Sequence, residues 1–182
     1  VLEYIGIVGL IDPPKDSVID DIKLCRKANV RVVMITGDNG ITASAIAKSI
    51  GMDNVNNIIT GDMLNKMSDK ELQEKVRDVS IFSIVIPEHK MRIVNAFQAN
   101  GEIVAMTGDG VNDAPALKQA EIGIAMGKRG SEVSREAADL VLMDDNFSTI
   151  VDTIYDGRRI YDNINKAICY IFVINITIEL YS

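Results

Sequence analysis

Short apolar runs alternate along most of the chain with longer stretches in which apolar residues recur at helical spacing. The short runs predict strands over residues 4–11, 31–35, 57–60, 81–86, 103–106, 122–126 and 140–143. The longer stretches predict helices over residues 15–28, 41–50, 68–76, 88–100 and 131–138, and a further helix that begins at Asp113. Strands that alternate with helices indicate βαβ units, so we predict an α/β fold built on a mainly parallel sheet.

Local signals mark where several of these helices begin and end. Ser68 and Glu71 have the spacing of a capping box, in which each residue satisfies a free N–H group of the other. Pro87 suits the first turn of a helix, where its missing N–H group does no harm. Gly51 and Gly101 stand where two helices are expected to stop.

The pattern changes at residue 147, where a helical spacing continues in a charged background. Arg158, Arg159 and Lys166 then precede an apolar run over 167–180, which is shorter than the roughly 20 residues that span a bilayer. Because the chain ends within this run, we expect the start of a transmembrane helix. Basic residues before such a run place residues 1–166 on the cytoplasmic side. The residues alone leave open a second interpretation, an amphipathic helix that packs on the domain or on a partner.

Composition and charge narrow the class of protein. Apolar residues make up 47% of the 182 residues, which is ample for a core, and the formal net charge of −7 argues against nucleic acid as a partner. The two cysteines, Cys25 and Cys169, lie far apart in the sequence. Neither has metal-ligand spacing, and a disulfide framework is not expected.

The stretch 107–118 carries the most specific chemical signal. Its two carboxylates, Asp109 and Asp113, follow a buried strand on a glycine-rich turn, and Asp113 is expected to cap the next helix, with Pro115 in its first turn. Open α/β sheets bind ligands at the carboxyl ends of their strands. Two oxygen ligands at such a turn suit Mg²⁺, which shares its remaining positions with water and phosphate. The alternative is an N-capped turn with solvated carboxylates.

Two further motifs supply a hydroxyl group, backbone N–H groups and a cation that could act together with Asp109 and Asp113. Thr36, Gly37 and Asp38 follow the strand predicted over 31–35, and Lys90 lies at the start of a helix. Taken singly, Thr36 is expected to be a strand-end cap and Lys90 a solvated lysine. His89, the single histidine of the sequence, is expected to be structural or exposed rather than catalytic.

Together these motifs resemble the phosphorylation domain of P-type cation-transporting ATPases, and the match favours the calcium-pump-like branch. The resemblance covers essentially the whole chain and rests on five motifs in the family's order: Asp12-Pro13-Pro14, Met34-Ile35-Thr36-Gly37-Asp38, Pro87-Glu88-His89-Lys90, Thr107 to Lys118, and Asp144-Asp145-Asn146-Phe147. The segment 157–164 resembles the stalk that leads into the family's fifth transmembrane helix. On this basis residues 1–146 are a partial phosphorylation domain, 147–166 a stalk helix, and 167–182 the truncated start of a transmembrane helix.

The resemblance implies a haloacid-dehalogenase-like fold of the Rossmann type. It also implies phosphoryl transfer from ATP to an aspartate, followed by hydrolysis of the aspartyl phosphate, with Mg²⁺ as cofactor. The implied partners are ATP, a transported cation (Ca²⁺ for this branch), the remainder of the pump chain, and membrane lipid.

The resemblance also assigns roles to individual residues. Residues that contact the phosphoryl group or the nucleotide would be Thr36 through its hydroxyl, Gly37 through its N–H group, Lys90 as the cation, Asn112, and Asp38 near the nucleotide. Asp109 would bind Mg²⁺ directly, and Asp113 would support both the metal and Lys90. Asp12, Pro13 and Pro14 would form the hinge towards a nucleotide-binding domain.

The family's phosphorylated aspartate lies in a D-K-T-G-T motif, and these 182 residues contain no such motif. We therefore expect the chain to lack the nucleophile-bearing strand, which belongs at the centre of the sheet between the strands that end at Thr36 and Thr107. The isolated chain is then expected to form no phosphoenzyme, and either to be marginally stable or to pair the open position with another chain.

Two departures from the family's pattern bear on function. Ser83-Ile84 stands where the family commonly has Ala-Arg, and the sequence over 175–179 leaves the transported ion open. Two alternatives to a pump segment are a non-catalytic remnant and a soluble haloacid-dehalogenase-type phosphatase. The phosphatase is disfavoured because it too requires an N-terminal D-x-D motif.

Overall fold

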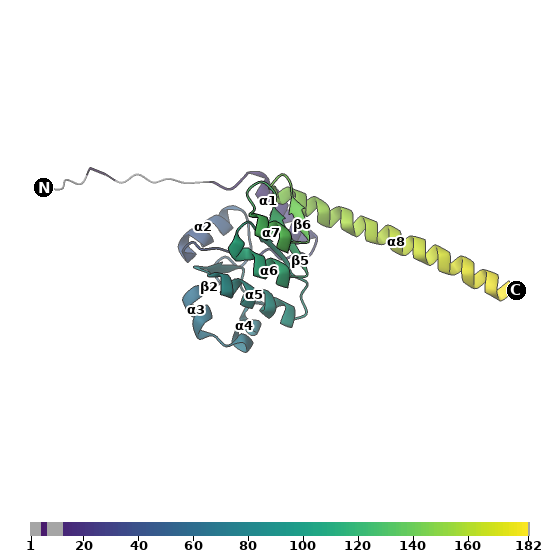
Figure 1. Ribbon diagram of the computed structural model, residues 1–182, viewed down its shortest axis with the longest axis horizontal. Coiled ribbons are helices and arrows are strands. Elements are labelled where there is room, and N and C mark those ends of the chain that lie inside the picture. Colours follow the sequence, from purple (N-terminus) through teal and green to yellow (C-terminus); the bar gives the residue numbers. More distant parts are fainter. Residues whose placement is uncertain (1–4, 7–12, 182) are drawn as a thin grey trace.

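The computed structural model describes residues 5, 6 and 13–181, with side chains as far as residue 176 (Figure 1). Most of the strand predicted over 4–11, and the whole of Asp12, lie outside the described residues. The helices are α1 (Ser17–Lys27), α2 (Gly40–Ser49), α3 (Gly61–Lys66), α4 (Asp69–Lys75), α5 (Pro87–Ala99), α6 (Ala114–Gln119), α7 (Glu132–Ala137) and α8 (Phe147–Tyr181), with a 3₁₀ turn η1 (Val111–Asp113) before α6. The strands are β1 (Met34–Ile35), β2 (Ile58–Thr60), β3 (Ile81–Ser83), β4 (Ala105–Gly108), β5 (Ile122–Met126) and β6 (Leu140–Leu142).

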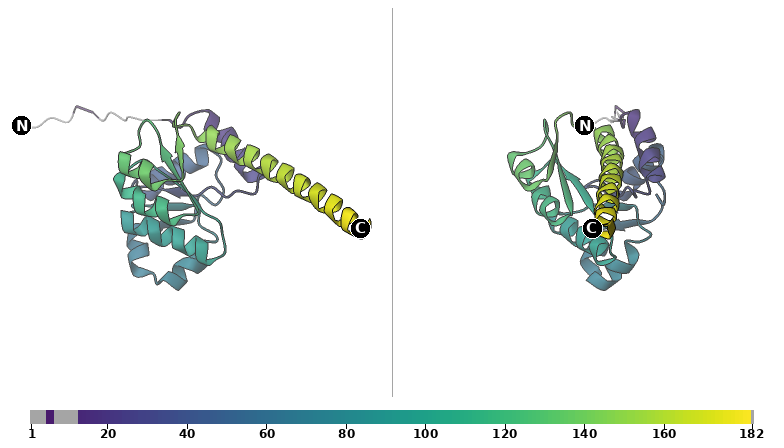
Figure 2. Two further views of the ribbon diagram at one scale, coloured as in Figure 1. Left: turned by 45° about the vertical axis from the view of Figure 1, so that its right-hand side comes forward. Right: turned by 90° about the vertical axis from the view of Figure 1, so that its right-hand side faces the viewer.

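The described strands form two separate three-stranded parallel sheets, with the orders β1-β3-β2 and β4-β5-β6. β1 and β4, which carry the first and second strand-end motifs, are therefore both edge strands. This is the pair of strands between which the sequence predicted a missing central strand. In the right-hand view of Figure 2, which looks along α8, the two halves lie on either side of that helix. The α/β fold and the interrupted parallel sheet are thus as predicted.

Helix α5 holds the two halves together. Ile93 and Phe97 on α5 pack into the core beneath the first sheet, against Phe82 of β3. Val94, the residue after Ile93, packs into a second core with Met106 of β4 and Leu117 of α6. These side chains are almost fully buried, so α5 is fixed against both sheets by the burial of apolar area.

Several element boundaries differ from the sequence prediction for local reasons. β3 ends at Ser83 rather than at residue 86 because Ile84 adopts a φ of 54°, which a β-branched residue rarely does and which breaks the strand. The predicted capping box is present, with Ser68 and Glu71 bonded reciprocally at the start of α4. Helix α3 was not predicted; it begins where the Thr60 hydroxyl accepts a hydrogen bond from the Met63 N–H.

Helix α8 is continuous from residue 147 to residue 181 and leaves the α/β domain after its first turns (Figure 1). The Ser148 hydroxyl anchors it to α1 by a hydrogen bond to the buried Asp21 carboxylate (2.7 Å). Arg158 donates a second bond to the carbonyl of Ala28, the residue that follows α1 (2.6 Å). None of the helices in the described part of the chain is both long enough and apolar enough to cross a bilayer. Cys25 and Cys169 are both free thiols.

Candidate active site

The turn after β4 is built around the side chain of Asp113. Its Oδ2 atom accepts hydrogen bonds from the backbone N–H groups of Asp109 (3.3 Å) and Gly110 (3.1 Å). Asp113 does directly precede α6, but its carboxylate makes no capping bond to that helix. The predicted N-cap position of Asp113 is therefore confirmed, but the side-chain capping bond is absent. The reason is that the carboxylate turns back into the loop and satisfies the N–H groups of the preceding residues instead.

The other oxygen of Asp113 forms an ion pair with the Lys90 ammonium group. Lys90 lies in the first turn of α5, and the side chains of Lys90 and Asp113 are 21% and 8% exposed. Lys90 is therefore a partly buried cation with a fixed partner, which contradicts only the alternative of a solvated lysine that was considered for this residue taken singly. Since its ammonium group is held by a residue of the 107–118 stretch, the pair joins two of the sequence motifs.

Asp109 lies at the same turn with an exposed side chain. Its backbone carbonyl accepts hydrogen bonds from the Ser131 N–H (2.7 Å) and the Ser134 hydroxyl (3.2 Å), which both belong to the start of α7. Ser134 is completely buried. The contact fixes the backbone of Asp109 and leaves its carboxylate available to a ligand. Sequence reasoning did not identify Ser134, because a serine inside a short helix carries no recognisable signal.

The turn after β1 is tied to the end of β3. The Thr36 hydroxyl accepts a hydrogen bond from the Asp38 N–H (3.1 Å), and the Asp38 carbonyl accepts one from the Ile84 N–H (3.0 Å). The Thr36 carbonyl accepts a further bond from the Val85 N–H (3.1 Å). Gly37 and Asp38 are exposed. The turn is thus held by its backbone and by the Thr36 hydroxyl, while Gly37 and Asp38 face solvent, where a ligand could reach them.

A groove of about 720 Å³ lies between the facing edge strands β1 and β4. On the β1 side its lining consists of Asn29, Val30, Arg31, Val33 and Ile35, and on the β4 side it runs from Glu102 to Asp109; it also includes Lys90 and Asp113. The structure therefore brings Lys90, Asp109 and Asp113 together at one cavity. The remaining predicted site residues lie outside its lining: Pro13, Pro14, Thr36, Gly37, Asp38 and Asn112.

The donor set at this groove suits a metal that needs few protein ligands. Among the described residues there is no group of three or more His, Cys, Asp or Glu side chains that could enclose a metal ion. Mg²⁺ does not need one, since it is commonly bound by one or two carboxylates together with water and phosphate oxygens. The exposed Asp109 carboxylate fits as a direct ligand. The Asp113 carboxylate, which is already bonded to Lys90 and to two N–H groups, fits better as the group that orients the turn.

The carboxylates of the Asp144-Asp145-Asn146-Phe147 motif stabilise the local structure at the start of α8. The Asp144 carboxylate accepts hydrogen bonds from the Thr149 hydroxyl (2.6 Å) and the Asn146 N–H (3.2 Å). The bond from Thr149 lowers the pKa of the Asp144 carboxyl below its usual value. Asp145 accepts bonds from the N–H groups of Lys128 (3.0 Å) and Arg129 (2.9 Å). The motif thus fixes the start of α8 to the loop after β5.

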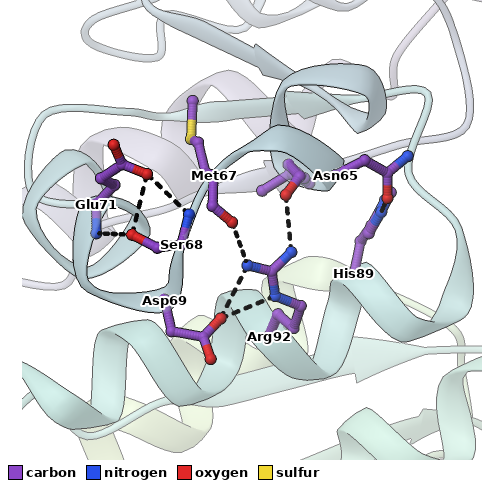
Figure 3. Close-up of polar contacts among 8 residues, drawn as sticks. Asn65, Met67, Ser68, Asp69, Glu71, His89 and Arg92 are labelled. Carbon is purple, nitrogen blue, oxygen red and sulfur yellow. Dashed lines mark hydrogen bonds and ion pairs between the residues drawn. The ribbon is translucent and has the colours of Figure 1, made fainter.

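His89 lies beside Lys90 but points away from the groove, into the contact between α5 and α3 (Figure 3). The residue is 3% exposed, and its Nε2 atom lies 2.8 Å from Oδ1 of Asn65. The backbone N–H of Ile86 approaches Nδ1 at 3.5 Å. Nδ1 can accept that bond only in the neutral ring, which then donates from Nε2 to Asn65. His89 is therefore structural, as expected, and buried.

The pH dependence of stability should report on this buried ring. Burial and the charge of Arg92 lower the pKa of His89 below its usual value, while Glu88 acts in the opposite direction. The folded protein therefore favours the neutral ring, so this contribution to stability is full above pH 6.5 and is lost as the pH falls below that value. We expect the difference in unfolding free energy between the parent chain and His89→Gln to shrink between about pH 7 and 5. Urea titrations at several pH values measure it, and a pH-independent difference would contradict a neutral buried His89.

A second prediction concerns two buried serines. The Ser83 hydroxyl, at the end of β3, is buried and has no hydrogen-bond partner among the described residues, whereas the equally buried Ser134 hydroxyl has partners. We expect Ser83→Ala to stabilise the chain by about 1 kcal/mol, because the substitution removes an unsatisfied polar group. Ser134→Ala should destabilise it by a similar amount. Urea unfolding of both variants tests this, and a loss of stability in Ser83→Ala would show that its hydroxyl is bonded.

Comparisons with known proteins identify the family to which this fold belongs. A family model described as haloacid dehalogenase-like hydrolase matches residues 1–121, and a second model with the same description matches residues 89–154. The chain belongs to the haloacid dehalogenase-like hydrolases. The fold class predicted from the sequence is therefore confirmed.

Several curated proteins that are similar to this chain are named as calcium ATPases. It is 53% identical over 176 residues to a calcium-transporting ATPase of Bacillus subtilis (strain 168), covering 96% of the chain and 20% of that protein. It is 48% identical over 180 residues to the endoplasmic reticulum calcium ATPase srcA of Aspergillus fumigatus, covering 96% of the chain and 18% of that protein. The chain thus spans about a fifth of the length of the curated relatives it matches. The resemblance to P-type cation-transporting ATPases of the calcium-pump branch is confirmed.

A solved structure gives the same result for the fold. The catalytic domain of the CPx-ATPase CopB-B, described in connection with nucleotide binding, superimposes with a TM-score of 0.59 at 25% identity. The match covers 78% of this chain and 45% of that one. This chain therefore shares its fold with the catalytic domain of a CPx-ATPase.

Proposed function

We propose that this chain is the phosphorylation-domain segment of an ATP-driven calcium pump that works through an aspartyl-phosphate intermediate. The observation that carries the proposal is the groove between β1 and β4, at which Lys90, Asp109 and Asp113 converge. Phosphoryl transfer needs a positioned cation to offset the charge of the phosphoryl group and a carboxylate that can bind Mg²⁺. Lys90, held by Asp113, and the exposed Asp109 carboxylate provide these two groups. The relatives named above support Ca²⁺ as the transported ion and the wider pump chain as the partner.

In the proposed reaction, a carboxylate oxygen of the D-K-T-G-T aspartate attacks the γ-phosphorus of ATP. The bond from that phosphorus to the bridging oxygen breaks, and ADP leaves with the bonding electrons. Water later cleaves the aspartyl phosphate to phosphate and the free carboxylate. Because the aspartate is absent from these 182 residues, the isolated chain is proposed to be inactive.

The residues of this chain would stabilise the charge that develops on the phosphoryl group. Lys90 supplies a positive charge that Asp113 holds in position. The Thr36 hydroxyl and the Gly37 N–H group donate hydrogen bonds to phosphoryl oxygens. Other contacts are proposed for Asn112 with the phosphate and for Asp38 near the nucleotide.

Mg²⁺ would be held by Asp109, and it supplies positive charge that offsets the charge of the phosphoryl oxygens when bound. Asp113 supports the metal site indirectly, because it accepts hydrogen bonds from the N–H groups of Asp109 and Gly110 and so fixes the conformation of the turn. The backbone of Asp109 is held from the other side by Ser131 and Ser134.

The groove has the backbone groups that an additional strand would require. Met34 and Thr36 donate their N–H groups to β3, so the alternation of a strand directs those of Val33 and Ile35 to the opposite edge. On β4, the Val104 carbonyl accepts from Ile122 of β5, which directs the peptide groups of Ala105 and Thr107 away from β5. We propose that the strand bearing D-K-T-G-T pairs with both edges and brings its aspartate to Lys90 and Asp109.

The remaining assignments concern the parent protein. We propose that residues 1–146 are the phosphorylation domain on the cytoplasmic side, that residues 147–166 of α8 form a stalk, and that residues 167–182 enter the membrane. Asp12, Pro13 and Pro14 are proposed as the hinge towards the nucleotide-binding domain. The lipid bilayer is then a partner of the last part of the chain.

The proposal is tested by using ¹⁹F NMR to measure the binding of beryllofluoride, a phosphoryl mimic. The chain is mixed with Mg²⁺ and with a synthetic segment that carries the D-K-T-G-T strand. We expect a bound fluoride signal only when chain, segment and Mg²⁺ are all present. Asp109→Asn should abolish it, and Asp78→Asn, which removes an exposed carboxylate outside the groove lining, should leave it unchanged. Absence of a bound signal from the complete mixture would overturn the proposal in favour of a non-catalytic remnant.

A further inference from the structure

Helix α5 meets the α3–α4 segment along one side, while Lys90 on its other side reaches Asp113. Figure 3 shows the two side chains that make this contact, His89 in the first turn of α5 and Arg92 in the next. Arg92 donates to the carbonyls of Leu64 (2.7 Å) and Met67 (2.9 Å) at the end of α3, and it pairs with Asp69 (2.8 Å) at the start of α4. These bonds hold the second turn of α5 from one direction.

The first turn of α5 is held by His89. Its Nε2 atom is hydrogen-bonded to Oδ1 of Asn65 of α3 at 2.8 Å, and the residue is buried. At Gly61, the first residue of α3, an added Cβ would lie 3.4 Å from Cε1 of His89 and would collide with the Ile84 carbonyl. The ring is thus enclosed between α3, its own helix and the turn after β3. Such an enclosed, hydrogen-bonded side chain has little freedom to move, and neither has the turn that carries it.

We propose that His89 is a positioning residue for Lys90. The two residues are adjacent in the first turn of α5, and they leave the helix in different directions: His89 towards α3, and Lys90 towards Asp113 and the groove. Locking the His89 ring fixes the backbone from which the Lys90 side chain extends. The ammonium group then stays at the phosphoryl site before any ligand binds, which is the preorganisation that transition-state stabilisation requires. His89 itself contacts neither the groove nor a ligand.

This inference rests on the proposed role of Lys90, but its test does not require phosphoryl chemistry. The measurement is the ¹⁵Nζ–¹H signal of the Lys90 ammonium group in the complete 182-residue chain, assigned by its loss in Lys90→Arg. An ammonium group held in an ion pair exchanges its protons slowly, whereas a freely moving one exchanges them fast. We expect His89→Ala to accelerate this exchange about tenfold, as would follow from losing about 1.4 kcal/mol of local order.

Three further variants separate positioning from simple loss of stability. His89→Gln, whose amide can replace the Nε2 donor to Asn65, should restore slow exchange. Asn65→Ala removes only the partner, at an exposed position, and should accelerate exchange even if His89→Ala fails to fold. Asn100→Ala serves as the matched control, because it removes hydrogen bonds with Arg77 and Gln73 at the far end of α5. It should lower stability while leaving the Lys90 signal unchanged.

The outcomes distinguish this inference from the proposed function. Faster exchange in His89→Ala and Asn65→Ala, with rescue by His89→Gln, supports positioning whether or not beryllofluoride binds. An unchanged Lys90 signal in a folded Asn65→Ala or His89→Ala variant would overturn it. An equal acceleration in Asn100→Ala would also overturn it, because general loosening of α5 would then explain the effect.

Discussion

Gly108→Ala is expected to destabilise the chain by about 3 kcal/mol, near the upper end of the usual range for overpacking. Gly108 ends β4, and the side chain of Asp113 folds directly over it. A Cβ at this position would lie 2.7 Å from Cγ of Asp113 and would also collide with its Cβ. Asp113 cannot withdraw cheaply, since its carboxylate holds two N–H groups of the turn and the Lys90 ammonium group. The substitution should therefore weaken the turn and the ion pair together.

The control for this prediction lies in the same turn. A Cβ at Gly110 would approach Oδ2 of Asp113 only to 3.5 Å, an ordinary van der Waals contact, so Gly110→Ala should change stability by less than about 1 kcal/mol. Urea unfolding of the two variants and the parent gives both values. If Gly108→Ala were as stable as Gly110→Ala, Asp113 would not occupy the position described here.

Lys90→Met is expected to have the second large effect, a loss of about 3 kcal/mol in the free energy of unfolding. The substitution keeps most of the apolar stem of Lys90 and removes its charge, which leaves the Asp113 carboxylate, 8% exposed, without its cation. Removing one member of a buried ion pair typically costs about 3–5 kcal/mol because the other charge stays buried. We take the lower end because Lys90 is 21% exposed and water can reach part of the pair.

A double-mutant cycle with Asp113→Asn checks the cause of that loss. Once Asp113 carries no charge, replacing Lys90 should cost much less than it does in the parent chain. The expected coupling between the two positions is about 1–3 kcal/mol, measured by urea unfolding of the four proteins. Additive losses would mean that Lys90 and Asp113 do not interact in solution.

The fold was largely predictable from the sequence because strands and helices alternate with clear periodicities. Ile122–Met126 was predicted with the bounds that the structure has, since this short apolar run becomes the central strand of its sheet. At the open edges, β1 was predicted too long, whereas β4 has the predicted length of four residues but begins two residues later than predicted. β1 contains only Met34–Ile35, because an edge strand has a hydrogen-bonded neighbour on one side alone. The early end of β3 could not be predicted, because nothing in the sequence indicates that Ile84 adopts a left-handed backbone conformation.

The candidate site was predictable as a set of residues and less so as a geometry. The motifs singled out Lys90, Asp109 and Asp113, which the structure brings together at the groove. The sequence could not indicate that the Asp113 carboxylate turns back into the loop, because capping a helix and bridging a turn call for the same residue type. Ser134 and the buried environment of His89 depend on contacts between distant segments, which no local pattern encodes.

Hydrogen exchange of the backbone amides of Val33, Ile35, Ala105 and Thr107 tests the central claim most directly, with and without the segment that carries the D-K-T-G-T strand. If that strand enters the groove, these amides should become protected by at least about tenfold. Amides of the outer edge strands β2 and β6 should not change, because they lie at the other sides of the two sheets. Protection at β2 or β6, or none at the four groove amides despite binding of the segment, would contradict the account.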